Sequence, residues 1–298
     1  MRQAFSIMKA TALEILSEPL TLLVLLAALT MTTLAPAFHY HQFGDPTRMA
    51  RDAGFSALFT CGSIVAVFGT IRAFRREVET GTLEMALAHP VSRSAFFLAK
   101  TAGAFVAYLV FALTVFGATL AIFQGADVGG AIARQTGDIA RIFGPYLAAG
   151  VAIAVLPLVL AAGWNRFAGG RFVLSSLLLA FSLSGATSVA VLWLSRLTLV
   201  RLVPVAVLVM LMALPLFAAA AAFSIRLKAN AAASAVGFVF ALLLPTVGNY
   251  YLVDRLADGG TLPWSYVGLA AAATLPAVVA FLLLGVHFIN SRDIQWTT

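Results

Sequence analysis

Eight long stretches without a charged residue alternate with short polar segments along this chain. All 19 basic and all 12 acidic residues lie outside these stretches, which cover residues 20–38, 54–71, 101–123, 142–163, 172–195, 202–223, 231–253 and 264–286. A bilayer core about 30 Å thick is crossed by roughly 20 apolar residues in a helix, because a helix satisfies its own backbone hydrogen bonds. The pattern therefore predicts one all-α domain over residues 1–298, a polytopic bundle of about eight transmembrane helices.

The distribution of charge predicts how these helices are oriented. With the N-terminus in the cytoplasm, the inner segments carry twelve of the 19 basic residues and six of the 12 acidic ones. This excess of basic charge inside agrees with the positive-inside rule. We expect a multi-pass protein of the cytoplasmic (inner) membrane with both termini in the cytoplasm. Contact with the lipid bilayer accounts for the pI of about 10.1, so no nucleic-acid partner is implied.

The number of spans has an alternative. The eight-span arrangement places Arg196 and Arg201 outside, against the general distribution of charge. A six-span arrangement would instead make one apolar pair a re-entrant or interfacial hairpin.

Residues 1–19 are too polar to span a membrane. They nevertheless place apolar residues at helical spacing, namely Phe5, Met8, Ala12 and Ile15. This pattern is typical of a helix that lies in the membrane interface, with its apolar side toward the lipid. A frayed cytoplasmic tail is the alternative.

Motifs for catalysis and metal binding are missing from the sequence. It contains no GxxxxGK[ST], HExxH or GxSxG pattern, and its one cysteine, Cys61, lies in an apolar stretch. We therefore expect no enzymatic activity, no cofactor and no metal site in this chain. The HxH pattern of His39 and His41 is interpreted as solvated loop residues. The absence of charged residues from the apolar stretches argues against a carrier driven by ion or proton gradients.

Two aromatic residues follow an asparagine near the outer end of the seventh stretch. Asn249, Tyr250 and Tyr251 lie within the sequence GNYYLVD. Interfacial anchoring is the simpler interpretation of these residues. A possible outer gate that lines a substrate exit is the more specific one.

The segment 75–93, RREVETGTLEMALAHPVSR, is the most polar part of the chain's first third. The second span can continue as a helix through Glu77 and Glu79, and Gly81 then permits a turn that other residues resist. Thr82 can cap a short helix, which Pro90 ends.

This short helix carries an apolar side chain, Leu83, and a charged one, Glu84, on different faces. Ser92 can then cap the next helix, which begins beside Arg93 and runs into the third span. Residues 72–100 are therefore predicted to form a helix–break–helix structure below the membrane, which we call the coupling elbow.

The coupling elbow resembles the first cytoplasmic loop of permease subunits of type 2 ATP-binding-cassette (ABC) exporters. The resemblance rests on two glutamates, GTLE at 81–84, PVSR at 90–93 and Lys100. Weaker likenesses are Glu14 in the N-terminal segment, FSIRLKAN at 223–230 and the C-terminal region from Gly248. Such permeases usually have six spans, so the apolar pair between 142 and 195 departs from the family pattern.

In that family the loop contains a coupling helix that docks onto the ATP-binding subunit. The resemblance therefore implies a coupling role for Glu77, Glu79, Gly81, Thr82, Leu83, Glu84, Pro90 and Arg93. It further implies a P-loop ATPase partner that binds ATP and Mg, and a second permease, either a homodimer mate or a related subunit. The expected function is ATP-driven export. The alternative is a carrier or channel that acts without ATP.

Overall fold

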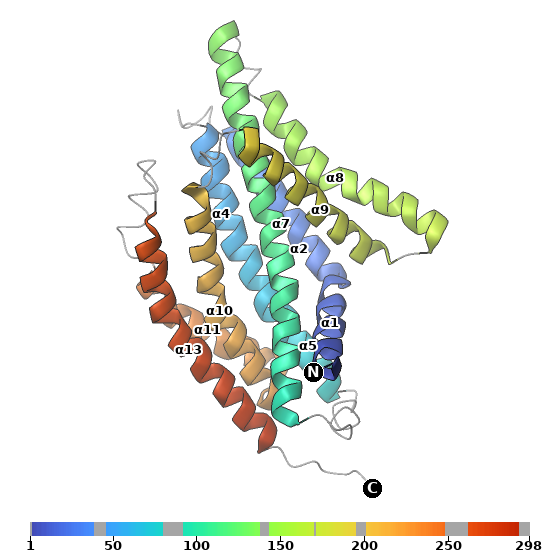
Figure 1. Cartoon of the computed structure of the whole chain (residues 1–298), viewed down its shortest axis with the longest axis vertical. Coiled ribbons are helices and arrows are strands. Elements are labelled where there is room, and N and C mark those ends of the chain that lie inside the picture. The colour runs from blue at the N-terminus through green and yellow to red at the C-terminus, as the bar shows by residue number, and fades with distance from the viewer. Residues whose placement is uncertain are drawn as a thin grey trace.

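The computed structural model describes residues 2–38, 46–79, 92–137, 143–169, 171–194, 201–247 and 262–291. Every regular element in these ranges is a helix, which confirms the predicted all-α class (Figure 1). The elements in chain order are α1 (Arg2–Leu16), α2 (Pro19–Leu34), η1 (Ala35–Phe38), α4 (Pro46–Ile64), η2 (Val65–Gly69), α5 (Thr70–Glu79), α7 (Arg93–Thr136), α8 (Phe143–Ala168), α9 (Phe172–Leu194), α10 (Val203–Arg226), α11 (Ala229–Val247) and α13 (Trp264–Asn290).

Seven helical segments in the described ranges are long and apolar enough to cross a membrane. They are Pro19–Ala37, Thr47–Glu77, Arg93–Thr136, Phe143–Phe167, Phe172–Trp193, Val203–Arg226 and Trp264–Asn290. The remaining predicted span, 231–253, begins inside α11, of which the apolar part Ala229–Ala241 is shorter. Each of the eight apolar stretches is thus helical where the structure describes it, and seven of the helices meet the length required of a span.

Two helices extend well beyond the apolar stretches that predicted them. The second span is one continuous helical rod from Pro46 to Glu79, with π-helical geometry over Val65–Gly69. The 44 residues of α7 make it about 66 Å long, at 1.5 Å per residue. Much of the polar segments 39–53 and 124–141 is therefore helical rather than loop. A left-handed Gly137, with φ of 71°, ends α7 by donating its N–H to the carbonyl oxygen of Ala133.

The long helix α7 lies at the centre of the bundle, with α1, α4, α8 and α9 packed against it (Figure 1). The helices α10 and α13 pack against each other on one side. On the other side, α8 and α9 are inclined to the bundle. The buried core around α7 contains Tyr108, Phe111 and many alanines, whose small side chains allow the helices to approach closely.

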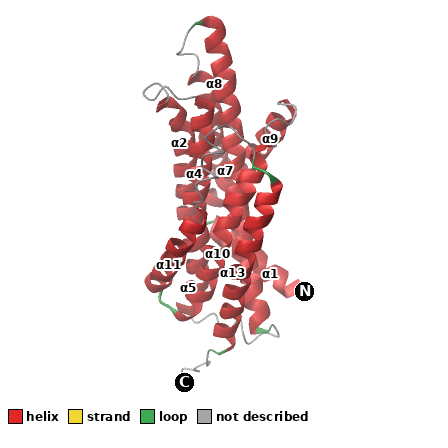
Figure 2. Ribbon diagram, turned by 90° about the vertical axis from the view of Figure 1, so that its left-hand side faces the viewer, coloured by secondary structure: helices red, strands yellow, loops and turns green. Residues whose placement is uncertain are grey.

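Helix ends from both halves of the chain gather at one end of the bundle. The last residues of α5, α10 and α13, the first turns of α7 and the whole of α1 lie there (Figure 2). This grouping places the two arms of the coupling elbow, α5 and the start of α7, among the ends of helices from the second half of the chain.

Candidate functional site

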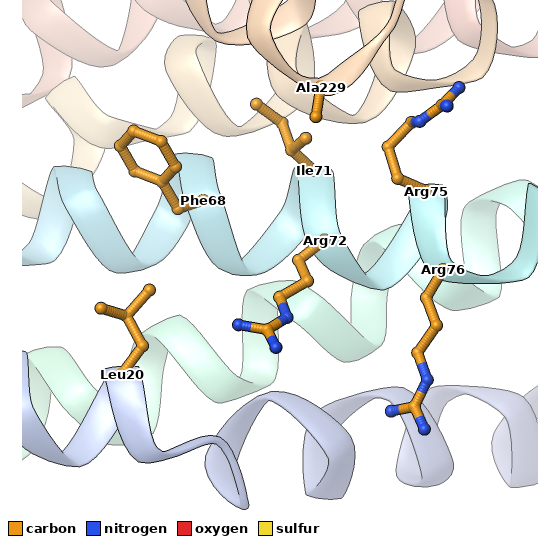
Figure 3. Close-up of a pocket in the computed structure, with 7 residues that line it drawn as sticks. All are labelled: Leu20, Phe68, Ile71, Arg72, Arg75, Arg76 and Ala229. Carbon is orange, nitrogen blue, oxygen red and sulfur yellow. The ribbon is translucent and has the colours of Figure 1, made fainter. Parts of the chain in front are cut away.

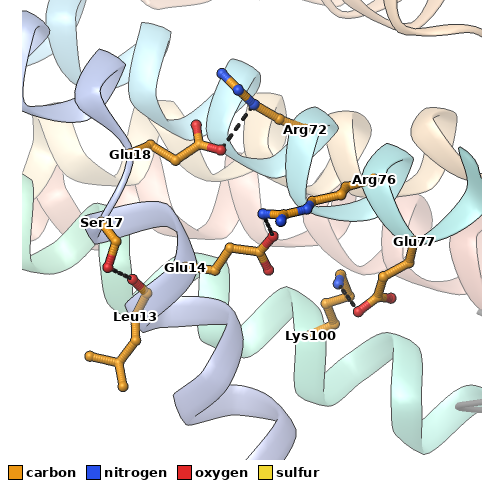
Figure 4. Close-up of polar contacts among 8 residues, drawn as sticks. All are labelled: Leu13, Glu14, Ser17, Glu18, Arg72, Arg76, Glu77 and Lys100. Carbon is orange, nitrogen blue, oxygen red and sulfur yellow. Dashed lines mark hydrogen bonds and ion pairs between the residues drawn. The ribbon is translucent and has the colours of Figure 1, made fainter. Parts of the chain in front are cut away.

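An ion pair joins the two arms of the coupling elbow. The Oε1 atom of Glu77, near the end of α5, lies 2.6 Å from Nζ of Lys100, early in α7 (Figure 4). The side chain of Lys100 is 1% exposed and that of Glu77 is 28% exposed. Removing one member of a buried ion pair costs about 3–5 kcal/mol, because the other charge remains buried without compensation. We therefore expect the Glu77–Lys100 pair to hold α5 and α7 together.

Aromatic rings surround the ammonium group of Lys100. Its Nζ lies 5.6 Å from the ring centroid of Phe74 and 5.9 Å from that of Phe96. Phe74 also contacts Phe97, with 5.6 Å between ring centroids. These rings belong to a buried apolar cluster that includes residues of α10 and α13. The cation–π contacts and the dry surroundings both strengthen the attraction between Lys100 and Glu77.

Two further ion pairs attach α1 and the short linker after it to α5. Glu14 Oε1 lies 3.0 Å from Nη1 of Arg76, and Glu18 Oε1 lies 3.0 Å from Nε of Arg72 (Figure 4). The two arginines are four residues apart and so lie along one side of α5. Glu14 lies in α1 and Glu18 is the N-cap residue of α2, so the end of α1 and the junction between α1 and α2 are each connected to the first arm of the elbow.

Close backbone contact fixes α1 against α7 as well. A Cβ atom on Gly103 would clash with the carbonyl oxygen of Met8 and would lie 2.9 Å from Cβ of Thr11. The buried face of α1 includes Thr11, Ala12 and Ile15, whereas Phe5 is exposed. Residues 2–16 therefore form the predicted helix, but its buried face differs from the predicted Phe5–Met8–Ala12–Ile15 stripe and packs on protein.

Burial and a nearby cation act in opposite directions on Glu18. Loss of hydration raises the pKa of the Glu18 carboxyl above its ordinary value of 4.5, and this effect exceeds the lowering caused by Arg72. Ionisation of Glu18 therefore costs more free energy in the folded chain than in water, and Arg72 offsets part of that cost.

The ends of α10 and α13 also make polar contacts with the elbow. Together with the ion pairs above, these contacts form what we call the polar layer. Arg75 donates to the carbonyl oxygen of Leu227 at 3.4 Å, and Arg93 donates to that of Asn290 at 3.4 Å. Arg226 joins these two ends, because its Nη2 donates to Oγ of Ser291 at 2.7 Å. Each arm of the elbow is therefore hydrogen-bonded to a helix end from the second half of the chain.

The structure describes only part of the predicted coupling site. Glu77 and Arg93 make the contacts described above, and α5 includes the backbone of Glu79. As predicted, Ser92 caps α7 by accepting a hydrogen bond from the N–H of Ala95 at 3.3 Å. Five predicted coupling residues, Gly81, Thr82, Leu83, Glu84 and Pro90, lie outside the described residues. So do the three residues of the possible outer gate, Asn249, Tyr250 and Tyr251.

Sequence analysis missed the contribution of Glu18 and Arg72 to this site. A usable signal was present, because Glu14 and Glu18 share the four-residue spacing of Arg72 and Arg76. Matching spacings of opposite charge indicate that two segments can pair, although Glu18 lies beyond the end of α1 as the N-cap residue of α2. Which acidic pair meets which basic pair depends on the tertiary packing.

The described residues contain no group of three or more His, Cys, Asp or Glu side chains placed to hold a metal ion. His39 and His41 lie outside the described ranges. The polar contacts described at the elbow are ion pairs and hydrogen bonds to backbone carbonyl oxygens, and they connect helices.

The spanning helices and the polar layer at their common end define an integral, polytopic membrane protein. A family model described as "ABC-2 family transporter protein" matches residues 5–181, more than half of the 298 residues. The chain belongs to this family and is thus a membrane permease component of an ABC transporter, which confirms the resemblance identified in the elbow. The match includes α5, the elbow and all of α1 except its first three residues. No curated protein and no solved structure matches the chain.

Proposed function

We propose that this permease is the transmembrane subunit of an ABC exporter and that a separate ATPase subunit drives it through the coupling elbow. The Glu77–Lys100 pair carries the proposal. It joins α5 and α7 at the base of residues 80–91, the tip of the elbow, where the family resemblance places the docking helix. A force applied to this tip would therefore move both long helices together.

The other contacts of the site can transmit this force to further helices. Arg72 and Arg76 connect α5 to α1 and the linker after it, and Arg93 connects α7 to the end of α13. Discrete polar contacts of this kind can break and re-form as helices shift by one or two ångströms. In the proposed cycle, closure of the ATPase subunits moves the elbow, and the helix ends attached to it then rearrange the transport path.

The proposed assembly contains two permease subunits, either two copies of this chain or this chain with a related one. Two ATPase subunits bind ATP and Mg below the membrane. The polar layer and both termini face the cytoplasm, because this orientation places most of the basic residues inside. The membrane is the cytoplasmic (inner) membrane.

Substitutions in the tip of the elbow test the proposal. In Gly81→Val, a β-branched residue would strain the turn if it requires positive φ. In Glu84→Lys, a charge that could meet a basic patch on the ATPase is reversed. Both variants should insert normally, yet show weaker association with the ATPase and little substrate-stimulated ATP hydrolysis. The effect of Glu84→Lys should become smaller in high salt, which screens surface charges.

Asp258→Lys is the control, because this acidic residue lies in a segment predicted to be on the outside. It should change neither ATPase association nor hydrolysis. The proposal is wrong if the two tip variants behave normally while Asp258→Lys fails. Nucleotide-independent transport by purified vesicles that contain no ATPase would instead indicate a carrier or channel.

A further inference from the structure

A groove with a volume of about 590 Å³ lies on the outer side of α5, between α2 and α11 (Figure 3). One part of its lining is apolar and consists of Leu20, Phe68 and Ile71. The other part consists of the three arginines Arg72, Arg75 and Arg76, and Ala229 at the start of α11 forms the opposite wall. The groove therefore combines an apolar surface with three adjacent guanidinium groups.

The apolar residues of the groove lie at the boundary of the membrane-spanning region. Leu20 is in the first turn of the span Pro19–Ala37, and Phe68 precedes the end of the span Thr47–Glu77 by nine residues. Both side chains are largely exposed, Leu20 by 41% and Phe68 by 49%. Because both lie in helices long and apolar enough to span a membrane, we expect their exposed surfaces to face lipid chains. The groove thus extends from the hydrocarbon into the headgroup layer.

The arginines approach the groove from two sides. Figure 3 shows Arg75 directed toward α11, whereas Arg72 and Arg76 are directed toward α1 and α2. A planar guanidinium group forms paired hydrogen bonds with phosphate oxygens more readily than an ammonium group does. A phosphate placed in the groove would lie between Arg75 on one side and Arg72 and Arg76 on the other.

Two carboxylates balance part of this positive charge. Glu18 pairs with Arg72 through Nε, and Glu14 pairs with Arg76 through Nη1. These contacts orient the arginine side chains before a ligand binds. A guanidinium group carries five N–H donors, so an ion pair through Nε of Arg72 is compatible with donation to a second anion.

We propose that this groove binds one anionic phospholipid, with its phosphate among the three arginines and an acyl chain along Leu20 and Phe68. A free phosphate ion would share the arginine contacts but would not use the apolar surface. The lipid is favoured because the groove is continuous with the lipid-facing surface. The inference rests on the proposed orientation only in assigning the lipid to the cytoplasmic leaflet, which is rich in anionic lipids.

The bound lipid would contact the same arginines that pair with Glu14 and Glu18. Its phosphate would therefore share these guanidinium groups with the two carboxylates. A change in the anionic-lipid content of the membrane would thus alter the ion pairs of Glu14 and Glu18 without changing the protein. The groove is thus a site at which membrane composition can affect the elbow.

Lipid retention measured by native mass spectrometry tests the proposal. The purified full-length chain in detergent would be titrated with phosphatidylglycerol and, separately, with phosphatidylcholine. The chain should retain one phosphatidylglycerol at concentrations at which phosphatidylcholine is not retained. Arg75→Gln should weaken this retention about tenfold, the effect expected from losing one charge-assisted hydrogen bond. Ala229→Phe, which fills the groove without changing any charge, should also weaken it.

Arg166→Gln is the matched control, because Arg166 is an exposed arginine near the end of α8 and does not line the groove. It should leave retention unchanged. Equal retention of the two lipids, or unchanged retention in both groove variants, would overturn the proposal. If millimolar inorganic phosphate displaces the lipid from the wild type, the groove is a free-anion site and the proposal also fails. None of these measurements requires an ATPase, so they can fail or succeed independently of the proposed export function.

Discussion

Glu77 and Lys100 form an ion pair of 2.6 Å across the base of the coupling elbow, although 22 residues of chain separate them. Lys100 is fully buried beside Phe74 and Phe96, and among the described side chains Glu77 is its carboxylate partner. An ion pair to a buried cation makes the position of α5 relative to α7 specific. It also makes that position sensitive to single substitutions.

Glu77→Gln should destabilise the protein by about 3 kcal/mol, the lower end of the range for buried ion pairs, because Glu77 itself is partly exposed. The double variant Glu77→Gln with Lys100→Met should recover most of this loss, since it leaves no buried charge. Thermal unfolding in detergent measures both effects. The exposed pair Arg48–Asp52 provides the control, and Arg48→Gln should have little effect. A double variant less stable than Glu77→Gln would contradict the assigned role.

Gly103 and Gly237 should respond in opposite directions to alanine substitution. A Cβ atom on Gly103 clashes with the carbonyl oxygen of Met8, so Gly103→Ala should displace α1 and cost about 1–3 kcal/mol. No atom lies within 4 Å of a Cβ placed on Gly237, in the helix α11. Gly237→Ala should therefore stabilise its helix by about 0.5–1 kcal/mol. Equal effects of the two substitutions on the unfolding temperature would show that α1 does not pack closely on α7.

The ion pairs of Glu14 and Glu18 should control how readily α1 detaches from α5. In the double variant Glu14→Gln with Glu18→Gln, the attachments to Arg76 and Arg72 are removed while the apolar contacts remain. Each pair is partly exposed, so each should contribute less than about 1 kcal/mol. Hydrogen exchange in α1 should accordingly become several-fold faster, whereas exchange in α9 should stay unchanged. Unchanged exchange in α1 would show that its attachment depends on apolar packing alone.

The raised pKa of Glu18 predicts the direction of a pH effect. A carboxyl whose pKa is higher in the folded chain than in the unfolded chain binds its proton more tightly when folded. Its contribution to stability is therefore most favourable below about pH 4.5 and decreases as pH rises through the folded pKa. The stability of the wild type relative to Glu18→Gln should therefore decrease as pH rises from about 4.5 through the folded pKa of Glu18. Thermal unfolding at several pH values measures this change. An increase with pH would mean that Arg72 outweighs burial.

Much of the fold follows from the sequence because the bilayer imposes simple requirements. Each uncharged stretch of suitable length became a helix, since lipid leaves the backbone no other partner. The helix ends were less predictable. Outside the lipid, a helix continues as long as local caps and packing permit, so α7 runs to Gly137 rather than ending near residue 123. Hydropathy carries no information about that extension.

The candidate site was predictable in outline but not in its pairings. Glu77, Arg93 and Lys100 all belong to the family pattern, which marks them as candidates. That pattern does not predict that Glu77 pairs with Lys100. The contacts of Arg75 with Leu227 and of Arg93 with Asn290 join residues more than 150 positions apart. Such contacts depend on how the helices assemble, which local patterns do not specify.

Site-specific crosslinking at the tip of the elbow tests the central claim most directly. A photoreactive phenylalanine analogue would replace Glu84 in one variant and Asp258 in another, and captured proteins would be identified by peptide sequencing. If an ATPase docks on the elbow, position 84 should capture a protein with a GxxxxGK[ST] motif, with a yield that changes on addition of ATP and Mg. Position 258 should not capture that protein. Capture of no such ATPase at position 84, or equal capture at both positions, would contradict the proposed coupling role.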